Sequence, residues 1–308
     1  MGDSRLRTLS IAALQTAPVA GDPSATLERV ADRARAVRAA VPHTQLLLLP
    51  ELHLSAPPAL LDEHGGYPDR VATQVPGPIT EELGAIARET GLWLVPGSLY
   101  ERAEDGRIHN TAVVLSPEGE LIARYRKVFP WQPQEACAAG EEFVTFDIPD
   151  VARIGLAICY DGNFPETFRQ LAWMGAEVVL QPTLTTTSDR DPELVMARAN
   201  AIFNQLFVVS LNAAAPAALG RSLIVDPEGI VRVSAGDSEE LLTDVLDLEA
   251  VDRVRRFGTA GVSRMWDQIL RAGPGIELPM YGGSVQPQPR LPGVIGSEGP
   301  DRSDLPPG

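Results

Sequence analysis

Cys159 is the residue of this sequence whose surroundings most favour chemistry. It follows the apolar segment 154–158 and is followed by Gly162-Asn163 and then Pro165. This order predicts a strand, a sharp turn and a helix, which would place the sulfur near a helix N-terminus. Unpaired backbone N–H groups there stabilise a thiolate and, during a reaction, an oxyanion. The segment indicates a cysteine nucleophile; a small buried thiol is the other interpretation.

A cysteine nucleophile usually works with a histidine base, but none of the four histidines lies in a segment that distinguishes it. Glu51 is a candidate base because it follows the apolar run 45–49, and sites gather at the carboxyl ends of strands in open sheets. Partial burial there would raise the pKa of its carboxyl group toward a useful value. Taken alone, Glu51 fits the start of a solvated loop better.

Lys127 is the only lysine in the chain, because every other residue among the 26 basic ones is arginine. A sequence so biased toward arginine has replaced lysine wherever a plain positive charge is sufficient. Lysine differs in carrying a compact charge that can lose its proton. At the end of a predicted strand, this ammonium could hold the negative charge of a tetrahedral intermediate. Chance survival of one surface lysine is the alternative.

These residues together resemble the Glu-Lys-Cys signature of the nitrilase, or carbon–nitrogen hydrolase, superfamily. The signature lies in Pro50-Glu51, in Arg126-Lys127 and in the run 158–161. Two further runs, 127–135 closed by a glycine and 161–166, are most similar to the aliphatic amidase and formamidase branch. The resemblance covers roughly residues 8–235. It implies an α/β fold, the four-layer αββα sandwich of that superfamily.

The resemblance also implies a mechanism, in which an amide is hydrolysed through a thioester on Cys159. Glu51 would take the thiol proton, and Lys127 and the backbone N–H of Tyr160 would hold the oxyanion. Glu135 corresponds to a second catalytic carboxylate of the branch. The products would be a carboxylic acid and ammonia or an amine. No metal and no organic cofactor are expected.

The predicted substrate pocket departs from the amidase branch. We expect it to include Trp131, Cys137, Asn163 and Thr185, with Cys137 standing where the branch has an aromatic residue. The hydroxyl-rich run 183–188 replaces a stretch that bears a tyrosine. Smaller, hydroxyl-bearing residues in place of rings predict a wider and more polar pocket. The expected substrate is therefore an amide larger than formamide or acetamide.

Other functions fit the same residues. A nitrilase, an N-carbamoyl amide hydrolase and an amide-forming acyl transferase would share Glu51, Lys127 and Cys159 and would differ in the pocket and the acyl acceptor. A non-catalytic binding protein on the same scaffold would have lost at least one motif residue. Since the four motif residues, Glu135 included, are all present, the sequence favours an enzyme.

The elements that must position these residues alternate along the chain. Helices are predicted to begin near Asp22-Pro23, Thr80, Pro165 and Asp191-Pro192. Strands are predicted at 9–14, 45–49, 92–100, 111–115, 121–125, 143–148, 154–158, 178–181, 207–211, 223–225 and 230–233. We expect one hydrolase domain over residues 1–281, because no break in composition divides it. Residues 282–308, rich in Pro and Gly, are expected to form a tail or an inter-subunit arm.

The composition excludes several classes of partner. A net charge of −15 argues against nucleic acid and anionic membranes. No stretch approaches the ~20 apolar residues that span a bilayer. Two cysteines make a disulfide framework improbable. We therefore expect a cytoplasmic enzyme with a small-molecule amide substrate and, from the resemblance, a homodimer or larger homo-oligomer.

Overall fold

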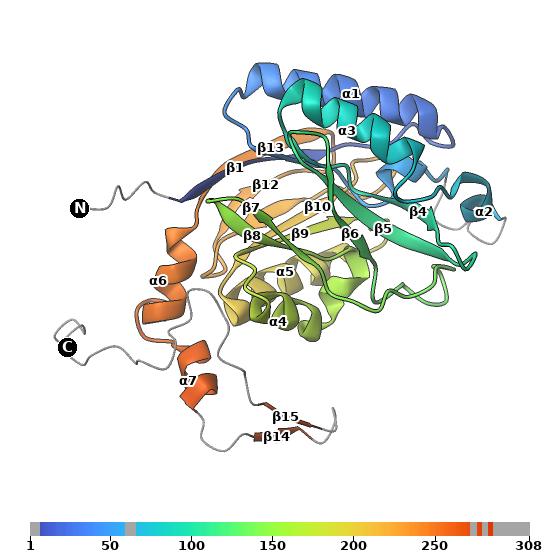
Figure 1. Ribbon diagram of the computed structural model, residues 1–308. Coiled ribbons are helices and arrows are strands. Elements are labelled where there is room, and N and C mark those ends of the chain that lie inside the picture. The colour runs from blue at the N-terminus through green and yellow to red at the C-terminus, as the bar shows by residue number, and fades with distance from the viewer. Residues whose placement is uncertain (1–6, 59–65, 272–275, 279–282, 286–308) are drawn as a thin grey trace.

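Two β-sheets pack face to face at the centre of the molecule (Figure 1). The computed structural model describes residues 7–58, 66–271, 276–278 and 283–285. The first sheet contains β1 (Thr8–Gln15), β2 (Leu46–Leu48), β3 (Trp93–Val95), β4 (Ser98–Arg102), β5 (Ile108–Leu115), β6 (Leu121–Arg126) and β13 (Glu240–Asp247). Its strands lie in the order β13-β1-β2-β3-β5-β4, and β6 pairs with β5. The second sheet contains β7 (Thr145–Ile148), β8 (Ala152–Leu156), β9 (Val178–Thr183), β10 (Phe207–Asn212), β11 (Leu223–Val225) and β12 (Val231–Ser234). Its strands lie in the order β12-β11-β10-β9-β8-β7.

Helices cover the outer face of each sheet. Helices α1 (Pro23–Ala40) and α3 (Pro78–Thr90) bury their apolar sides against the first sheet. Helices α4 (Pro165–Trp173) and α5 (Arg190–Asn204) do the same on the second sheet. The layers therefore run helix, sheet, sheet, helix, as Figure 1 shows. The predicted αββα sandwich is confirmed.

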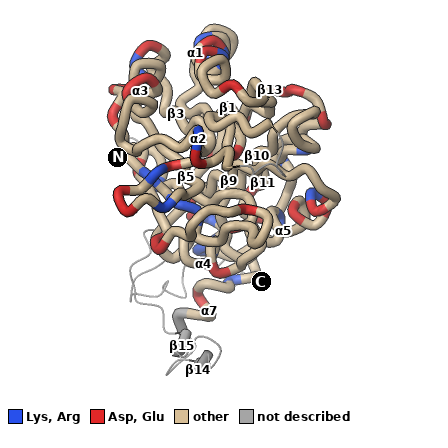
Figure 2. The backbone as a smooth tube through the Cα atoms, turned by 90° about the vertical axis from the view of Figure 1, so that its right-hand side faces the viewer, with Lys and Arg blue, Asp and Glu red and all other residues tan. Residues whose placement is uncertain are grey.

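Strand β2 shows why this sequence needs two cover layers. Leu46 and Leu48 belong to the core between the sheets, whereas Leu47 belongs to the cluster beneath α1 and α3. Successive strand residues point to opposite faces, so an unbroken apolar run suits a strand that is buried on both faces. Burying each leucine contributes about 2 kcal/mol. Charged positions gather on the outer helices, while the central strands are mostly uncharged (Figure 2).

Local signals set the helix ends as expected. The carboxylate of Asp22 accepts a hydrogen bond from the backbone N–H of Ala25 at 2.9 Å and so caps α1. Helix α3 ends at Gly91, whose φ of +63° is the left-handed conformation that glycine adopts without strain. These two helices were predicted from the same residues.

The predicted strand 92–100 is wrong as a single element. It forms two strands, β3 and β4, that are separated at Pro96-Gly97. Gly97 has a φ of +82°, and a Cβ atom at this position would overlap the carbonyl oxygen of Pro50. The break therefore lets the backbone pass close to the end of β2, directly before Glu51.

Strand β13 was not predicted, although it pairs with β1 along all eight residues from Glu240 to Asp247. Its inward residues Leu242 and Leu246 are buried, but their neighbours Leu241 and Val245 are apolar and exposed. Apolar residues on both faces hide the two-residue period that marks a half-buried strand.

The remaining described elements are short. They are the 3-10 helices η1 (His53–Ser55) and η3 (Cys159–Asn163), the helices α2 (Tyr67–Val71), α6 (Glu249–Phe257) and α7 (Met265–Arg271), and the strand pair β14 (Ile276–Leu278) and β15 (Gly283–Val285). Strand β15 falls within the predicted tail, and the rest of that tail lies outside the described residues. Among the helices of the described ranges, none is long and apolar enough to cross a bilayer.

Candidate active site

Cys159 stands on the sharp turn that its flanking residues predict. Strand β8 ends at Leu156, and the 3-10 helix η3 begins at Cys159 with a φ of +45°. This left-handed conformation is strained for a residue with a Cβ. Helix α4 follows from Pro165. The N–H of Tyr160 lies in the first turn of η3, where backbone donors lack acceptors within the helix.

Asp161 holds this turn against the opposite sheet. Its carboxylate accepts hydrogen bonds from the N–H of Ile158 at 2.8 Å, the N–H of Phe129 at 2.9 Å and the hydroxyl of Tyr125 at 2.7 Å. Tyr125 belongs to β6 of the first sheet. Burial raises the pKa of Asp161 to about 6, although Lys127 acts in the opposite direction. Asp161 therefore ties the cysteine turn to the strand that carries the lysine.

Lys127 brings two carboxylates together. Its Nζ lies 2.9 Å from Oε1 of Glu51 and 2.6 Å from Oε2 of Glu135. Each of the three side chains is at least nine-tenths buried. Glu51 follows β2, Lys127 follows β6, and Glu135 lies in the loop after Trp131, whose N–H donates to Glu135 Oε2 at 2.9 Å. The structure thus assembles three residues that are far apart in the sequence.

Asn110 completes this group and was missed in the sequence. From β5 its amide nitrogen donates to Oε1 of Glu51 and to Oε1 of Glu135, both at 2.8 Å. The side chain is fully buried. A polar residue inside the mostly apolar run of β5 was the available signal, since buried polar groups need partners.

The charges of this group follow from burial and from each other. Burial raises the pKa of Glu51, partly offset by Lys127. For Glu135, burial also acts upward, but Lys127 and the donors around it leave its pKa below the ordinary value. Burial acts to lower the pKa of Lys127, yet the two carboxylates hold it well above the ordinary value. Lys127 is therefore an ammonium, and Glu51 is the more basic carboxylate.

Cys159 rests as a thiol. Burial raises its pKa well above the ordinary value, and the negative charge of Glu51 adds to that effect. The charges of Glu51 and Lys127 both act on this thiol, which places the three groups near one another. The structure thus brings together the four residues of the motif, with Glu51, Lys127 and Glu135 buried and Cys159 partly exposed.

A small cavity of about 40 Å³ opens beside Cys159. Three predicted pocket residues, Trp131, Asn163 and Thr185, line it, and the Thr185 hydroxyl lies 3.9 Å from Sγ of Cys159. Cys137 does not line this cavity, which corrects its predicted position. It is buried in an apolar cluster that includes Leu52, Tyr100 and Leu184, in keeping with the behaviour of cysteine as a small hydrophobic side chain.

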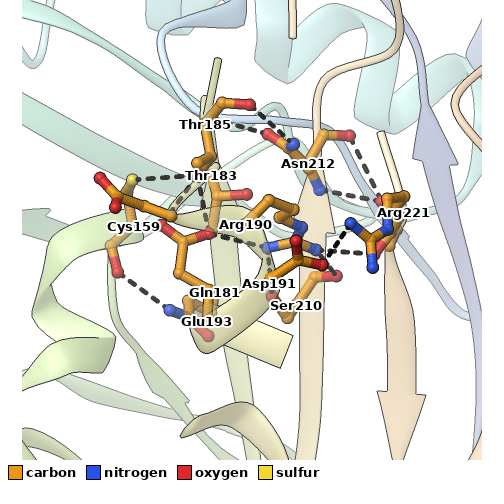
Figure 3. A network of polar contacts seen from close by, with 12 residues as sticks. Cys159, Gln181, Thr183, Thr185, Arg190, Asp191, Glu193, Ser210, Asn212 and Arg221 are labelled. Carbon is orange, nitrogen blue, oxygen red and sulfur yellow. Dashed lines mark hydrogen bonds and ion pairs between the residues drawn. The ribbon is translucent and has the colours of Figure 1, made fainter. Parts of the chain in front are cut away.

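Glu193 is a second residue that the sequence did not single out. Its carboxylate accepts hydrogen bonds from the Thr185 hydroxyl at 2.8 and 3.0 Å and lines the cavity (Figure 3). It also pairs with Arg190 at 3.1 Å. Glu193 comes from the first turn of α5, where an acidic residue is ordinary, so the sequence carries no distinguishing signal. Within the described ranges, no group of three or more His, Cys, Asp or Glu side chains is arranged to hold a metal ion.

Comparisons with known proteins show the family to which the chain belongs. The model of the carbon–nitrogen hydrolase family matches residues 10–256. Omega-amidase NIT2 from Mus musculus is 32% identical over 207 residues, which are 62% of this chain and 74% of that protein. The crystal structure of Nit3 from Saccharomyces cerevisiae, a member of branch 10 of the nitrilase superfamily, superposes with a TM-score of 0.73 at 27% identity, covering 81% of this chain and 93% of that one. An amidase from Nesterenkonia sp. superposes with a TM-score of 0.68 at 27% identity, covering 80% of this chain and 93% of the other. The chain belongs to the carbon–nitrogen hydrolase family of the nitrilase superfamily.

Proposed function

We propose that this enzyme hydrolyses the C–N bond of a small-molecule amide through a thioester on Cys159. The observation that carries the proposal is the buried contact of Lys127 with both Glu51 and Glu135 beside the thiol. Such a group places a base, a cation and a nucleophile around one reacting carbon. The names of the relatives, omega-amidase and amidase, support an amide as the substrate.

The first half of the reaction forms the acyl-enzyme. Glu51 accepts the proton of Cys159, and the sulfur attacks the amide carbon. The carbonyl oxygen becomes an oxyanion, which the Lys127 ammonium and the N–H of Tyr160 stabilise. When the intermediate collapses, the C–N bond breaks and Glu51 returns the proton to the leaving nitrogen. Ammonia or an amine departs, and the acyl group remains on sulfur.

The second half releases the acid. Glu51 takes a proton from water, and the hydroxide attacks the thioester carbon. Lys127 and Tyr160 again hold the oxyanion. The C–S bond then breaks, the sulfur recovers its proton and the carboxylic acid leaves. Glu135 and Asn110 do not exchange protons in this scheme; they keep Lys127 and Glu51 in place through their hydrogen bonds.

Intact-protein mass spectrometry after exposure to candidate amides tests the proposal. We expect an acyl adduct that maps to Cys159, and Cys159→Ala should give neither adduct nor turnover while keeping the fold. Turnover near the wild-type rate in Cys159→Ala would refute the assignment. Parallel incubations with nitriles, N-carbamoyl substrates and added amines distinguish a nitrilase, a carbamoyl hydrolase and an acyl transferase.

The proposal extends to substrate size and to assembly. The hydroxyl-bearing run 183–188, which stands where the amidase branch has a tyrosine-bearing stretch, is the reason for proposing an amide larger than acetamide; turnover of unsubstituted one- to three-carbon amides alone would contradict it. Exposed apolar side chains on α5, Val195 and Phe203, support a homodimer or larger homo-oligomer, which analytical ultracentrifugation tests.

Two free cysteines support a cytoplasmic location, which fractionation of the source cells tests.

A further inference from the structure

The wall of the cavity beside Cys159 presents hydrogen-bond acceptors. The Glu193 side chain reaches it from α5 and is only 7% exposed. Thr185 bridges this carboxylate and the sulfur, with its hydroxyl oxygen 3.9 Å from Sγ. Figure 3 shows the three side chains in this arrangement. The carboxylate is therefore close enough to contact the acyl part of a substrate bound to Cys159.

Two neighbouring side chains also present hydrogen-bond acceptors to the cavity. The Thr185 hydroxyl donates its single proton toward Glu193, so its oxygen can only accept from the cavity side. Asp189, exposed at the cavity, contributes a further carboxylate.

No positive side chain opposes these acceptors. Among the described residues that line the cavity there is no Lys, Arg or His. Arg190 balances Glu193 from behind, because it is fully buried and donates to the Ser210 hydroxyl at 3.2 Å and to the carbonyl of Arg221 at 3.0 Å. Lys127 is already shared by the two catalytic carboxylates. The negative end of the Glu193–Arg190 pair therefore faces the cavity.

We propose that this wall selects amides whose acyl part carries an amino group, held as an ammonium by Glu193 within a few bonds of the carbonyl carbon. The inference rests on the proposed amide hydrolysis and names the substrate class of the same site. An ammonium can donate to the Glu193 carboxylate and to the Thr185 oxygen. A carboxylate at the same place would meet the like charge of Glu193, which costs binding energy.

Three amides with acyl parts of equal length test in the wild-type enzyme whether an ammonium is preferred. They are 3-aminopropanamide, butyramide and malonamate, which place an ammonium, a methyl group and carboxylate oxygens at the same distance from the carbonyl. We expect kcat/KM to fall in that order, with the first at least roughly tenfold above the last. Malonamate turned over as well as, or better than, 3-aminopropanamide would overturn the proposal.

Variants then locate the selection. In Glu193→Gln the ratio of kcat/KM for 3-aminopropanamide over malonamate should fall roughly tenfold, and a ratio cancels any general loss of activity. Asp191→Asn is the matched control, since it removes the same charge from the same turn of α5 but pairs with Arg221 outside the cavity. It should keep the ratio. An unchanged ratio in Glu193→Gln would overturn the role of Glu193.

Glu193→Gln deprives the buried Arg190 of its anionic partner and can unfold the chain. Asp189→Asn, at an exposed residue of the same cavity, avoids this risk and should lower the ratio about twofold. A rise in the ratio would contradict the proposal. Absence of an acyl adduct on Cys159 with every candidate amide, these three included, would refute amide hydrolysis itself. Turnover of butyramide without preference by charge would refute the selection alone.

Discussion

The ammonium of Lys127 lies 2.9 Å from Oε1 of Glu51, although 76 positions separate the two residues in the sequence. The contact joins the end of β6 to the end of β2 inside the first sheet. The Lys127 charge acts to lower the pKa of Glu51, which burial raises, beside a thiol whose pKa is raised well above the ordinary value. Once ionised, Glu51 can take the thiol proton at the moment of attack.

Replacing Lys127 should harm stability as well as activity. In Lys127→Met, two buried carboxylates lose their cation, so we expect unfolding free energy to fall by about 3–5 kcal/mol at neutral pH and turnover to be lost. The pKa values of Glu51 and Glu135 would then rise above those of the unfolded chain. The folded state would bind more protons, so stability should fall as pH rises through these raised values and recover at lower pH.

Urea denaturation at pH 5 and pH 8 checks this dependence. The control is Arg153→Met, which removes a cation from a half-exposed pair with Asp147 and should cost about 1 kcal/mol or less. A Lys127→Met chain as stable as the wild type at pH 8 would show that the cation does not compensate the buried carboxylates.

The pH dependence of the wild-type enzyme should report the state of Glu51. Its pKa is raised by burial, and the base must be ionised to accept the thiol proton. We therefore expect kcat/KM to rise with pH through an apparent pKa above 4.5, the ordinary value of glutamate. Because Glu51, Lys127 and Glu135 interact strongly, that pKa belongs to the group. Steady-state rates across pH 4–9 measure this apparent pKa from the acid limb, which is the rise of kcat/KM at low pH. An apparent pKa at or below the ordinary value of glutamate would contradict a buried base.

The catalytic motif was predictable because its residues end strands or stand apart in composition. Glu51 follows an apolar run, and Lys127, the only lysine, comes at the end of a predicted strand. Cys159 lies between a strand and a proline-started helix. Glu135 depended on the resemblance to a family, since nothing in its loop distinguishes it. Strand order and sheet pairing then decide that all four meet.

The supporting residues could not be predicted in the same way. Asn110 lies in the middle of a strand, and Glu193 occupies an ordinary helix start. Each matters only because another segment brings a partner to it, which a local pattern does not record. Cys137 illustrates the reverse case. Its place where the amidase branch has an aromatic residue favoured the pocket, but packing against Tyr100 and Leu184 buries it elsewhere.

Asn110 should act as a positioning residue. Asn110→Leu removes the donor that holds both carboxylates, so we expect kcat to fall about 10- to 100-fold and KM to change less. Glu51 loses a bond that favours its charged form, and the acid limb of kcat/KM should move to higher pH. The control is Thr111→Val on the same strand, which loses a buried bond to Glu101 away from the site. It should keep the wild-type limb; equal pH profiles in both variants would contradict the assigned role.

The backbone at Cys159 stores strain that a pair of substitutions can measure. Its φ of +45° is costly for alanine and free for glycine. Cys159→Gly should therefore be more stable than Cys159→Ala by about 1 kcal/mol, although neither turns over substrate. At Cys137, which is not among the described residues with positive φ, the order should reverse, because glycine there only adds unfolded-state entropy. Chemical denaturation of the four variants compares the two positions. The same order at both would show that the turn carrying the nucleophile is unstrained.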